Sequence, residues 1–129
     1  MFLRCRTCVI VGVFSVKEGE AMSLLEALSW VRRLGLKKVY FELDAKVVVE
    51  AIKSSDVGIS EFGSIVQSCK DIIRCEHEFS TSFIRRQANE CAHALAKASC
   101  SYASPMVWSE PPDCVTSFLS HYCNNPSHY

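Results

Sequence analysis

The sequence lacks an excess of charge of either sign. Its 129 residues include 14 Lys and Arg against 14 Asp and Glu, so the formal net charge at pH 7 is zero. This balance excludes the global positive field that would by itself indicate a nucleic-acid-binding protein. A polyanionic partner therefore has to be held by local groups of basic residues.

The sequence also lacks an apolar run of the roughly 20 residues that a membrane-spanning helix needs. Arg4 and Arg6 precede the apolar residues 8–16 in the manner of a secretory signal, but no small-x-small cleavage site follows. Instead, Glu18 and Glu20 come directly afterwards. These features favour a protein that is neither secreted nor inserted in a membrane.

The cysteines lack a repeating interval. They number eight, at positions 5, 8, 69, 75, 91, 100, 114 and 123. This is below the density of a disulfide scaffold, so we expect mostly free thiols in a reducing compartment, the cytoplasm or the nucleus. Cys5 and Cys8 form a lone C-x-x-C without a second pair at zinc spacing, and we expect them to be ordinary strand residues.

What is present is a globular composition, with 49% hydrophobic and 22% charged residues. It suits one domain with a sizeable core. All four prolines lie after residue 103, where helical and strand periods fade. We therefore expect a domain over residues 1–102 and a loosely packed tail over residues 103–129, in which Trp108 and a short helical turn over residues 115–122 are the exceptions.

Hydrophobic spacing along the domain predicts strand, helix, strand, two helices, strand and helix, which is an α/β order. The expected elements are a strand or frayed strand pair within residues 2–14, a helix from Glu20 to Gly35, a strand over 39–43, helices over 45–53 and 59–74 with Ser60 as an N-cap, a strand over 78–84, and a last helix from Asn89 to about residue 102.

Residues 19–45 form the most informative segment. A helical wheel places Glu20 beside the apolar stripe of the first helix and turns Glu26 toward water. Gly35 closes this helix, because glycine readily takes the left-handed conformation at a helix end. Asp44 then follows the strand over residues 39–43, at the end of a strand where open α/β sheets bind ligands.

Four motifs in this order resemble the ribonuclease H-like superfamily, specifically the reverse-transcriptase-like domains (type-1-like) abundant in plants and related to retroelement ribonuclease H. The motifs are GEAMSLLEAL from residue 19, VYFELDAKVVVEAI from residue 39, FIRRQANECAHALAKAS from residue 83 and W-x-x-P-P from residue 108. The resemblance implies a mixed five-stranded sheet flanked by helices, with carboxylates that hold two Mg²⁺ or Mn²⁺ ions and cleave the RNA strand of an RNA–DNA hybrid.

By motif position, Glu20 matches the family's helix carboxylate and Asp44 its strand-end carboxylate, so both are expected catalytic metal ligands. Arg86 and Asn89 match an R-x-x-N motif and are expected to contact substrate. His93 stands at the catalytic position where the family has a last-helix aspartate. A neutral imidazole suits Mg²⁺ poorly as a ligand.

The family's first-strand aspartate has no counterpart, because residues 1–16 contain no Asp or Glu. The sequence thus looks like a family domain shortened at its N-terminus, whose sheet lacks its first strand or strands. With this incomplete carboxylate set, we expect the metal to be held weakly and the hydrolytic activity to be weak or lost.

Each candidate residue has a second interpretation that the sequence leaves open. Glu20 is also explained as an acid in the first turn of a helix, and Asp44 as the N-cap of the helix from Ala45. His93 is also explained as a partly exposed, hydrogen-bonded histidine, and Arg86 as part of a solvated strand end.

Three functions remain open from the sequence. The first is an RNA–DNA hybrid ribonuclease. The second is a non-catalytic nucleic-acid-binding or interaction module. The third is a retroelement-derived relic that folds poorly. The oligomeric state is not indicated by the sequence.

Overall fold

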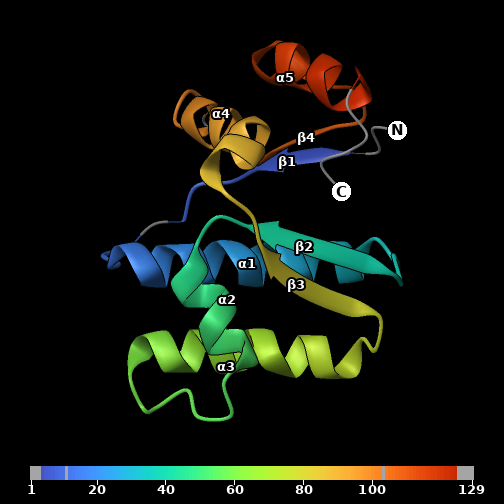
Figure 1. Cartoon of the computed structure of the whole chain (residues 1–129). Coiled ribbons are helices and arrows are strands. Elements are labelled where there is room, and N and C mark those ends of the chain that lie inside the picture. Colours follow the sequence, from blue (N-terminus) through green and yellow to red (C-terminus); the bar gives the residue numbers. More distant parts are fainter. Residues whose placement is uncertain (1–3, 11, 103, 125–129) are drawn as a thin grey trace. The chain divides into compact units, whose positions relative to one another are not determined.

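The computed structural model describes residues 4–10, 12–102 and 104–124, with side chains described as far as residue 119. The elements in chain order are β1 (Cys5–Thr7), α1 (Val16–Arg33), β2 (Val39–Leu43), α2 (Lys46–Lys53), α3 (Glu61–Cys75), β3 (Phe79–Phe83), the 3-10 helix η1 (Arg86–Asn89), α4 (Glu90–Ser99), β4 (Met106–Trp108) and α5 (Asp113–Asn124) (Figure 1). They form two compact units, one of residues 13–84 and one of residues 1–12 with 85–129.

The unit of residues 13–84 contains a parallel pair of strands. β2 pairs with β3 in a register that runs from Val39 opposite Phe79 to Leu43 opposite Phe83. Parallel strands require a crossover connection, which α2 and α3 supply here. Both strands and both helices were predicted from the sequence, and their positions are confirmed to within two residues at each end.

The core of this unit joins α1, both strands, α2 and α3. Its buried residues are Ala21, Leu24, Leu28, Phe41, Val48, Phe62, Val66, Cys69, Ile72 and Phe79. The rings of Phe41 and Phe79 meet edge to face across the strand pair, with centroids 5.3 Å apart. The apolar stripe predicted for the first helix is therefore the face that α1 buries.

The start of α1 differs from the prediction. The helix begins at Val16, because Ser15 and Glu18 form a capping box in which the Ser15 hydroxyl accepts from the Glu18 N–H and the Glu18 carboxylate accepts from the Ser15 N–H. The predicted start at Glu20 is wrong by four residues, because the Ser-x-x-Glu cap lies before the apolar stripe from which the start was predicted. The interpretation of Glu20 as a first-turn acid is also wrong, because Glu18 has that place.

The end of α1 was predicted correctly. Gly35 follows the helix with a φ of 74°, and its N–H donates to the Arg32 carbonyl. This is the left-handed conformation for which the sequence proposed a glycine.

The second unit is built on an antiparallel strand pair. β1 pairs with β4, with Cys5 opposite Trp108 and Thr7 opposite Met106. α5 packs on α4, and Val115 of α5 is only 1% exposed. The strand predicted within residues 2–14 is thus shorter than expected.

The expectation of a tail without regular structure is wrong for β4, whereas the helical turn predicted over residues 115–122 lies inside the longer helix α5. A strand of three residues is too short for its period to be read from the sequence. The division between a domain of residues 1–102 and a separate segment of residues 103–129 stays a prediction.

The α/β fold class is confirmed. The single five-stranded sheet implied by the family resemblance is not seen among the described residues, which form two sheets of two strands each. The described cysteines are free thiols. None of the described helices is both long and apolar enough to cross a membrane.

Candidate functional site

Asp44 lies directly after β2, at the C-terminal end of the parallel strand pair. The N-cap of the next helix is Ala45, whose carbonyl accepts from the N–H groups of Val48 and Val49, and no side chain caps this helix. The interpretation of Asp44 as a helix cap is therefore wrong, because the turn places Ala45 at that position. The half-exposed Asp44 side chain makes no hydrogen bond or ion pair with any residue that the structure describes.

Glu20 lies in the second turn of α1, next to the buried Ala21. Its side chain is half-exposed, and so is that of Glu26. The predicted contrast between a packed Glu20 and a solvated Glu26 is thus not seen in their exposure. The position of Glu20 along α1 supports its predicted role as a metal ligand better than its exposure does.

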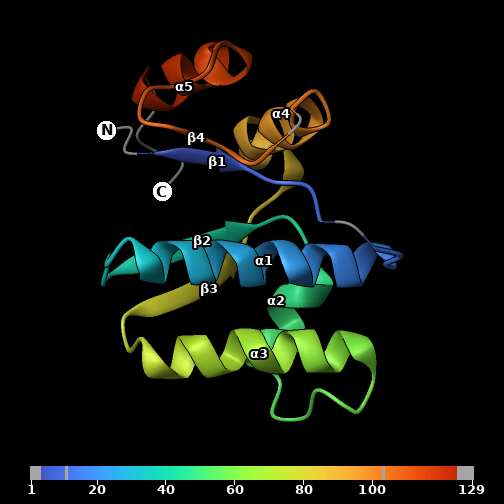
Figure 2. The same cartoon turned by 180° about the vertical axis from the view of Figure 1, so that it is seen from behind.

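β2 runs back along α1 in both views of the fold (Figure 1 and Figure 2). The five residues of β2 span about 16 Å, at a rise of about 3.3 Å per residue. An α-helix covers the same length with about eleven residues. The strand therefore brings its C-terminal end, which Asp44 follows, back toward the N-terminal half of α1. That half of the helix contains Glu20, so the two predicted metal ligands belong to neighbouring parts of one unit.

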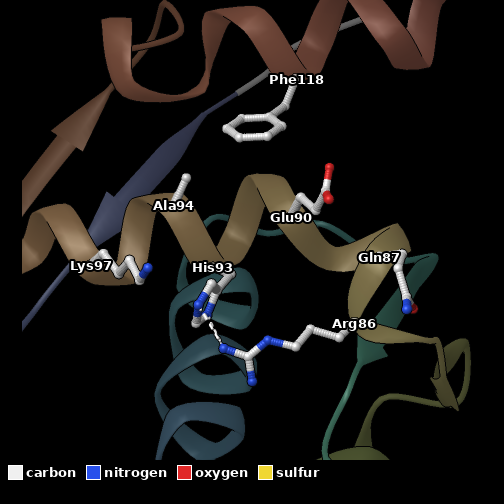
Figure 3. A pocket seen from close by; sticks show the side chains of 7 residues that line it. All are labelled: Arg86, Gln87, Glu90, His93, Ala94, Lys97 and Phe118. Carbon is white, nitrogen blue, oxygen red and sulfur yellow. Dashed lines mark hydrogen bonds between the residues drawn. The ribbon is translucent and has the colours of Figure 1, made fainter.

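His93 lies on α4 in the other unit and is paired with Arg86 of η1. The Arg86 Nη2 atom is 2.6 Å from His93 Nε2 and 3.3 Å from Nδ1 (Figure 3). Because a guanidinium only donates, the imidazole nitrogen is the acceptor of this hydrogen bond. The interpretation of His93 as a half-exposed, hydrogen-bonded histidine is supported, and the same nitrogen is not available to a metal.

Asn89 ends η1 and occupies the N-cap position of α4. The position agrees with the prediction, but its side chain makes no cap hydrogen bond, because its φ of −111° and ψ of 20° are not those of a side-chain cap. The amide of Asn89 is half-exposed. Arg86 and Asn89 therefore stand one at each end of the same helical turn.

The candidate residues fit a divalent metal only in part. Glu20 and Asp44 offer carboxylate oxygens, which are the ligands that Mg²⁺ and Mn²⁺ prefer. His93 does not fit, since the Arg86 guanidinium contacts its ring and repels a second cation. Among the residues described, no three His, Cys, Asp or Glu side chains gather into a possible metal site.

The structure also shows a pocket that sequence reasoning missed. It has a volume of about 390 Å³ and lies along one face of α4. Its lining residues are Arg86, Gln87, Glu90, His93, Ala94, Lys97 and Phe118. The helical spacing of positions 90, 93, 94 and 97 could have predicted that these residues share one face of α4. No sequence signal near Phe118 predicts that this residue of α5 lies beside that face.

The described elements form a mixed α/β domain, the fold class to which ribonuclease H-like domains belong. In the comparison with protein families, the reverse transcriptase-like family model matches residues 2–99. The chain therefore belongs to the reverse transcriptase-like family. No curated protein and no solved structure gives a significant match.

Proposed function

We propose that this chain is a nucleic-acid-binding domain of the RNA–DNA hybrid ribonuclease class in which metal-dependent hydrolysis is weak or lost. The family match supports nucleic acid as the partner. The observation on which the proposal depends is the hydrogen bond from Arg86 to His93. A position expected to supply a carboxylate to the metal instead supplies an imidazole acceptor to a guanidinium.

Through this hydrogen bond, His93 contacts Arg86 and does not serve as a metal ligand. A guanidinium has five N–H donors in a planar fork, and one of them is held by the imidazole. The remaining donors of the exposed Arg86 are free to bind two oxygens of a phosphate. His93 thus orients Arg86 for phosphate binding, and Asn89 at the end of the same turn adds an amide for substrate contacts.

Glu20 and Asp44 would hold a divalent ion if one binds. Such an ion, when bound, activates water and stabilises the leaving oxygen of a phosphodiester. Two carboxylates are a small ligand set for Mg²⁺, which prefers six oxygen ligands and keeps several waters. We therefore expect weak metal binding and slow or absent cleavage.

The test uses a labelled RNA–DNA hybrid with the wild-type chain, Asp44→Asn and Glu20→Gln, in Mg²⁺ and then in Mn²⁺. Glu26→Gln on the same helix is the matched control. We expect hybrid binding in all four proteins and cleavage near background. Clear turnover by the wild type that Asp44→Asn abolishes would instead establish an active hybrid ribonuclease.

Binding itself is tested through Arg86. Arg86→Gln should weaken hybrid binding uniformly and lower the salt slope by about one unit, because one phosphate contact is lost. Arg74→Gln on α3 is the control with a similarly exposed arginine. Wild-type chain that binds neither hybrid nor duplex at low salt would contradict the proposal and leave the non-nucleic-acid interaction module.

A cytoplasmic or nuclear location and a retroelement origin are further parts of this proposal. The free thiols of the described cysteines support a reducing compartment. A poorly folding relic is less well supported, because α1, α2, α3 and both parallel strands share one core. A cooperative thermal transition of the purified chain would exclude the relic.

A further inference from the structure

The two sides of the pocket along α4 differ in chemical character. Figure 3 shows Phe118 of α5 facing α4 from one side, with Glu90 and Ala94 directed toward it. Arg86 and His93 lie on the opposite side. An aromatic ring and a cationic group therefore border the same 390 Å³ space.

The charges of the pocket are unequal. Arg86 and Lys97 are exposed cations, and the His93 ring contacts the Arg86 guanidinium at 2.6 Å. Glu90 is the only carboxylate among the lining residues described, and it lies on the side of Phe118. An anion is therefore favoured beside Arg86 and Lys97, whereas a hydrogen-bond donor is favoured near Glu90.

We propose that this pocket binds one unpaired nucleotide of a single-stranded nucleic acid. Its phosphate contacts Arg86 and Lys97, its base stacks on Phe118, and the Glu90 carboxylate accepts from an amino group of the base. The inference rests on the proposed function only in taking nucleic acid as the partner. Phe118 lies outside residues 2–99, so the site extends beyond the part of the chain that matches the family.

The dimensions and the chemistry both suit this ligand. Small-ligand pockets measure about 300–1,000 Å³, a range that includes the present volume. Stacking on an aromatic side chain requires a base whose face is exposed, which single strands offer and duplexes do not. Phosphate held by arginine and lysine, with a base on an aromatic ring, is the usual combination in single-strand binding.

Lys97 also has a simpler explanation, because it lies in the last turn of α4, where the helix dipole favours a cation. The dipole predicts an effect of Lys97 on helix stability only. A phosphate contact predicts an effect on binding and on its salt dependence. The two are therefore separated by measuring both quantities.

The first experiment places a reporter in the pocket. In the full chain, Phe118→Trp adds an indole whose fluorescence is compared with that of the wild type, which contains Trp30 and Trp108. We expect adenosine monophosphate to quench the added signal. Inorganic phosphate should compete with the nucleotide without quenching by itself, because it lacks a base to stack.

The second experiment measures binding of a fluorescent oligoadenylate. Phe118→Leu should weaken binding about five-fold or more, since base stacking on an aromatic is worth about 1–3 kcal/mol and tenfold is about 1.4 kcal/mol. Lys97→Gln should lower the salt slope by about one unit. Phe83→Leu and Lys53→Gln, exposed residues of the other unit, are the matched controls.

The outcomes separate this inference from the proposed function. Thermal melts first confirm that each variant is folded. If hybrid binding is intact but the nucleotide causes no quenching, and Phe118→Leu and Lys97→Gln bind single strands like their controls, the pocket proposal is wrong and the proposed function stands. If the wild type fails to bind hybrid while the nucleotide quenches the Phe118→Trp signal, the pocket proposal is supported and the proposed function is contradicted.

Discussion

At the scale of single residues, the pairing of Arg86 with His93 changes what the last helix can do. A carboxylate at position 93 would attract both the guanidinium and a metal ion, and the two would compete. The His93 imidazole instead accepts from Arg86 at 2.6 Å. This pairing supports the proposed phosphate contact of Arg86 over a metal ligand at position 93.

Cys69 shows how burial determines the chemistry of a thiol. Its side chain is fully buried in the core of residues 13–84, and its Sγ donates to the Ala21 carbonyl at 3.7 Å. Burial disfavours the charged thiolate and raises the pKa of Cys69 to about 12, from an ordinary value of 9.0. The thiol is thus neutral and inert at physiological pH.

This raised pKa predicts a loss of stability in alkaline solution. Below pH 9 the Cys69 thiol is neutral in the folded and unfolded states, but above pH 9 it ionises first in the unfolded state. From about pH 8 to about pH 10 the free energy of unfolding should fall by about 1.4 kcal/mol more in the wild type than in Cys69→Ala. Urea titrations at both pH values measure this difference.

Cys75→Ala is the control, because Cys75 is exposed. It removes an exposed thiol and keeps Cys69, so it should show the same fall in unfolding free energy as the wild type between the two pH values. An identical pH dependence in the wild type and Cys69→Ala would contradict the assignment of a buried neutral thiol.

At the scale of elements, α3 packs tightly against the turn that leads into it. Ser60 caps the helix, and its hydroxyl accepts from the Gly63 N–H at 3.1 Å. A Cβ added at Gly63 would clash with the Val57 carbonyl oxygen and approach that of Gly58 at 2.8 Å. Backbone atoms of a turn do not yield as a flexible side chain would, so the glycine is needed for close approach.

Gly63→Ala should therefore destabilise the protein by about 1–3 kcal/mol, the usual range for an overpacked site. Gly19→Ala in α1 is the matched control, because nothing lies within 4 Å of its added Cβ. Alanine in a helix is favoured over glycine by about 1 kcal/mol, so this change should stabilise the protein. Chemical denaturation of both variants checks the two opposite signs, and equal effects would contradict the clash.

Elements with a strong local period were predictable. The alternation and β-branching of β2 and β3 and the apolar spacing of α2 and α3 are repeated within each segment, so local sequence was sufficient. The start of α1 was missed because a capping box with Ser15 and Glu18 depends on two polar residues and not on a period. β1 and β4 are three residues each, too short for any period to be read.

At the scale of the whole molecule, residues from both ends of the chain build one unit. β4 supplies the partner strand of β1, and Val115 of α5 is buried where α5 packs on α4. Tyr102 and Trp108 stack edge to face, with centroids 5.4 Å apart. The segment after residue 102 thus supplies structure that β1 and α4 use.

Deletion of residues 103–129 should destabilise this unit and spare the other. β1 loses its strand partner, and α4 loses the helix packed on it, whereas the core of residues 13–84 contains no residue of the deleted segment. Hydrogen exchange should show α4 losing protection while α1 and α3 keep theirs. Unchanged protection of α4 would show that residues 1–102 fold without the rest and would favour the predicted domain boundary.

The sequence by itself determined the α/β class, the main helices and parallel strands, and the family, because these depend on residue spacing within short segments. Glu20, Asp44, Arg86, Asn89 and His93 were predicted as site residues by motif, and these roles stay predictions. Only the tertiary structure decided that Asp44 is not a cap, that His93 holds Arg86, and that Phe118 borders a charged pocket. These facts join residues through turn geometry and packing between elements, which local spacing does not determine.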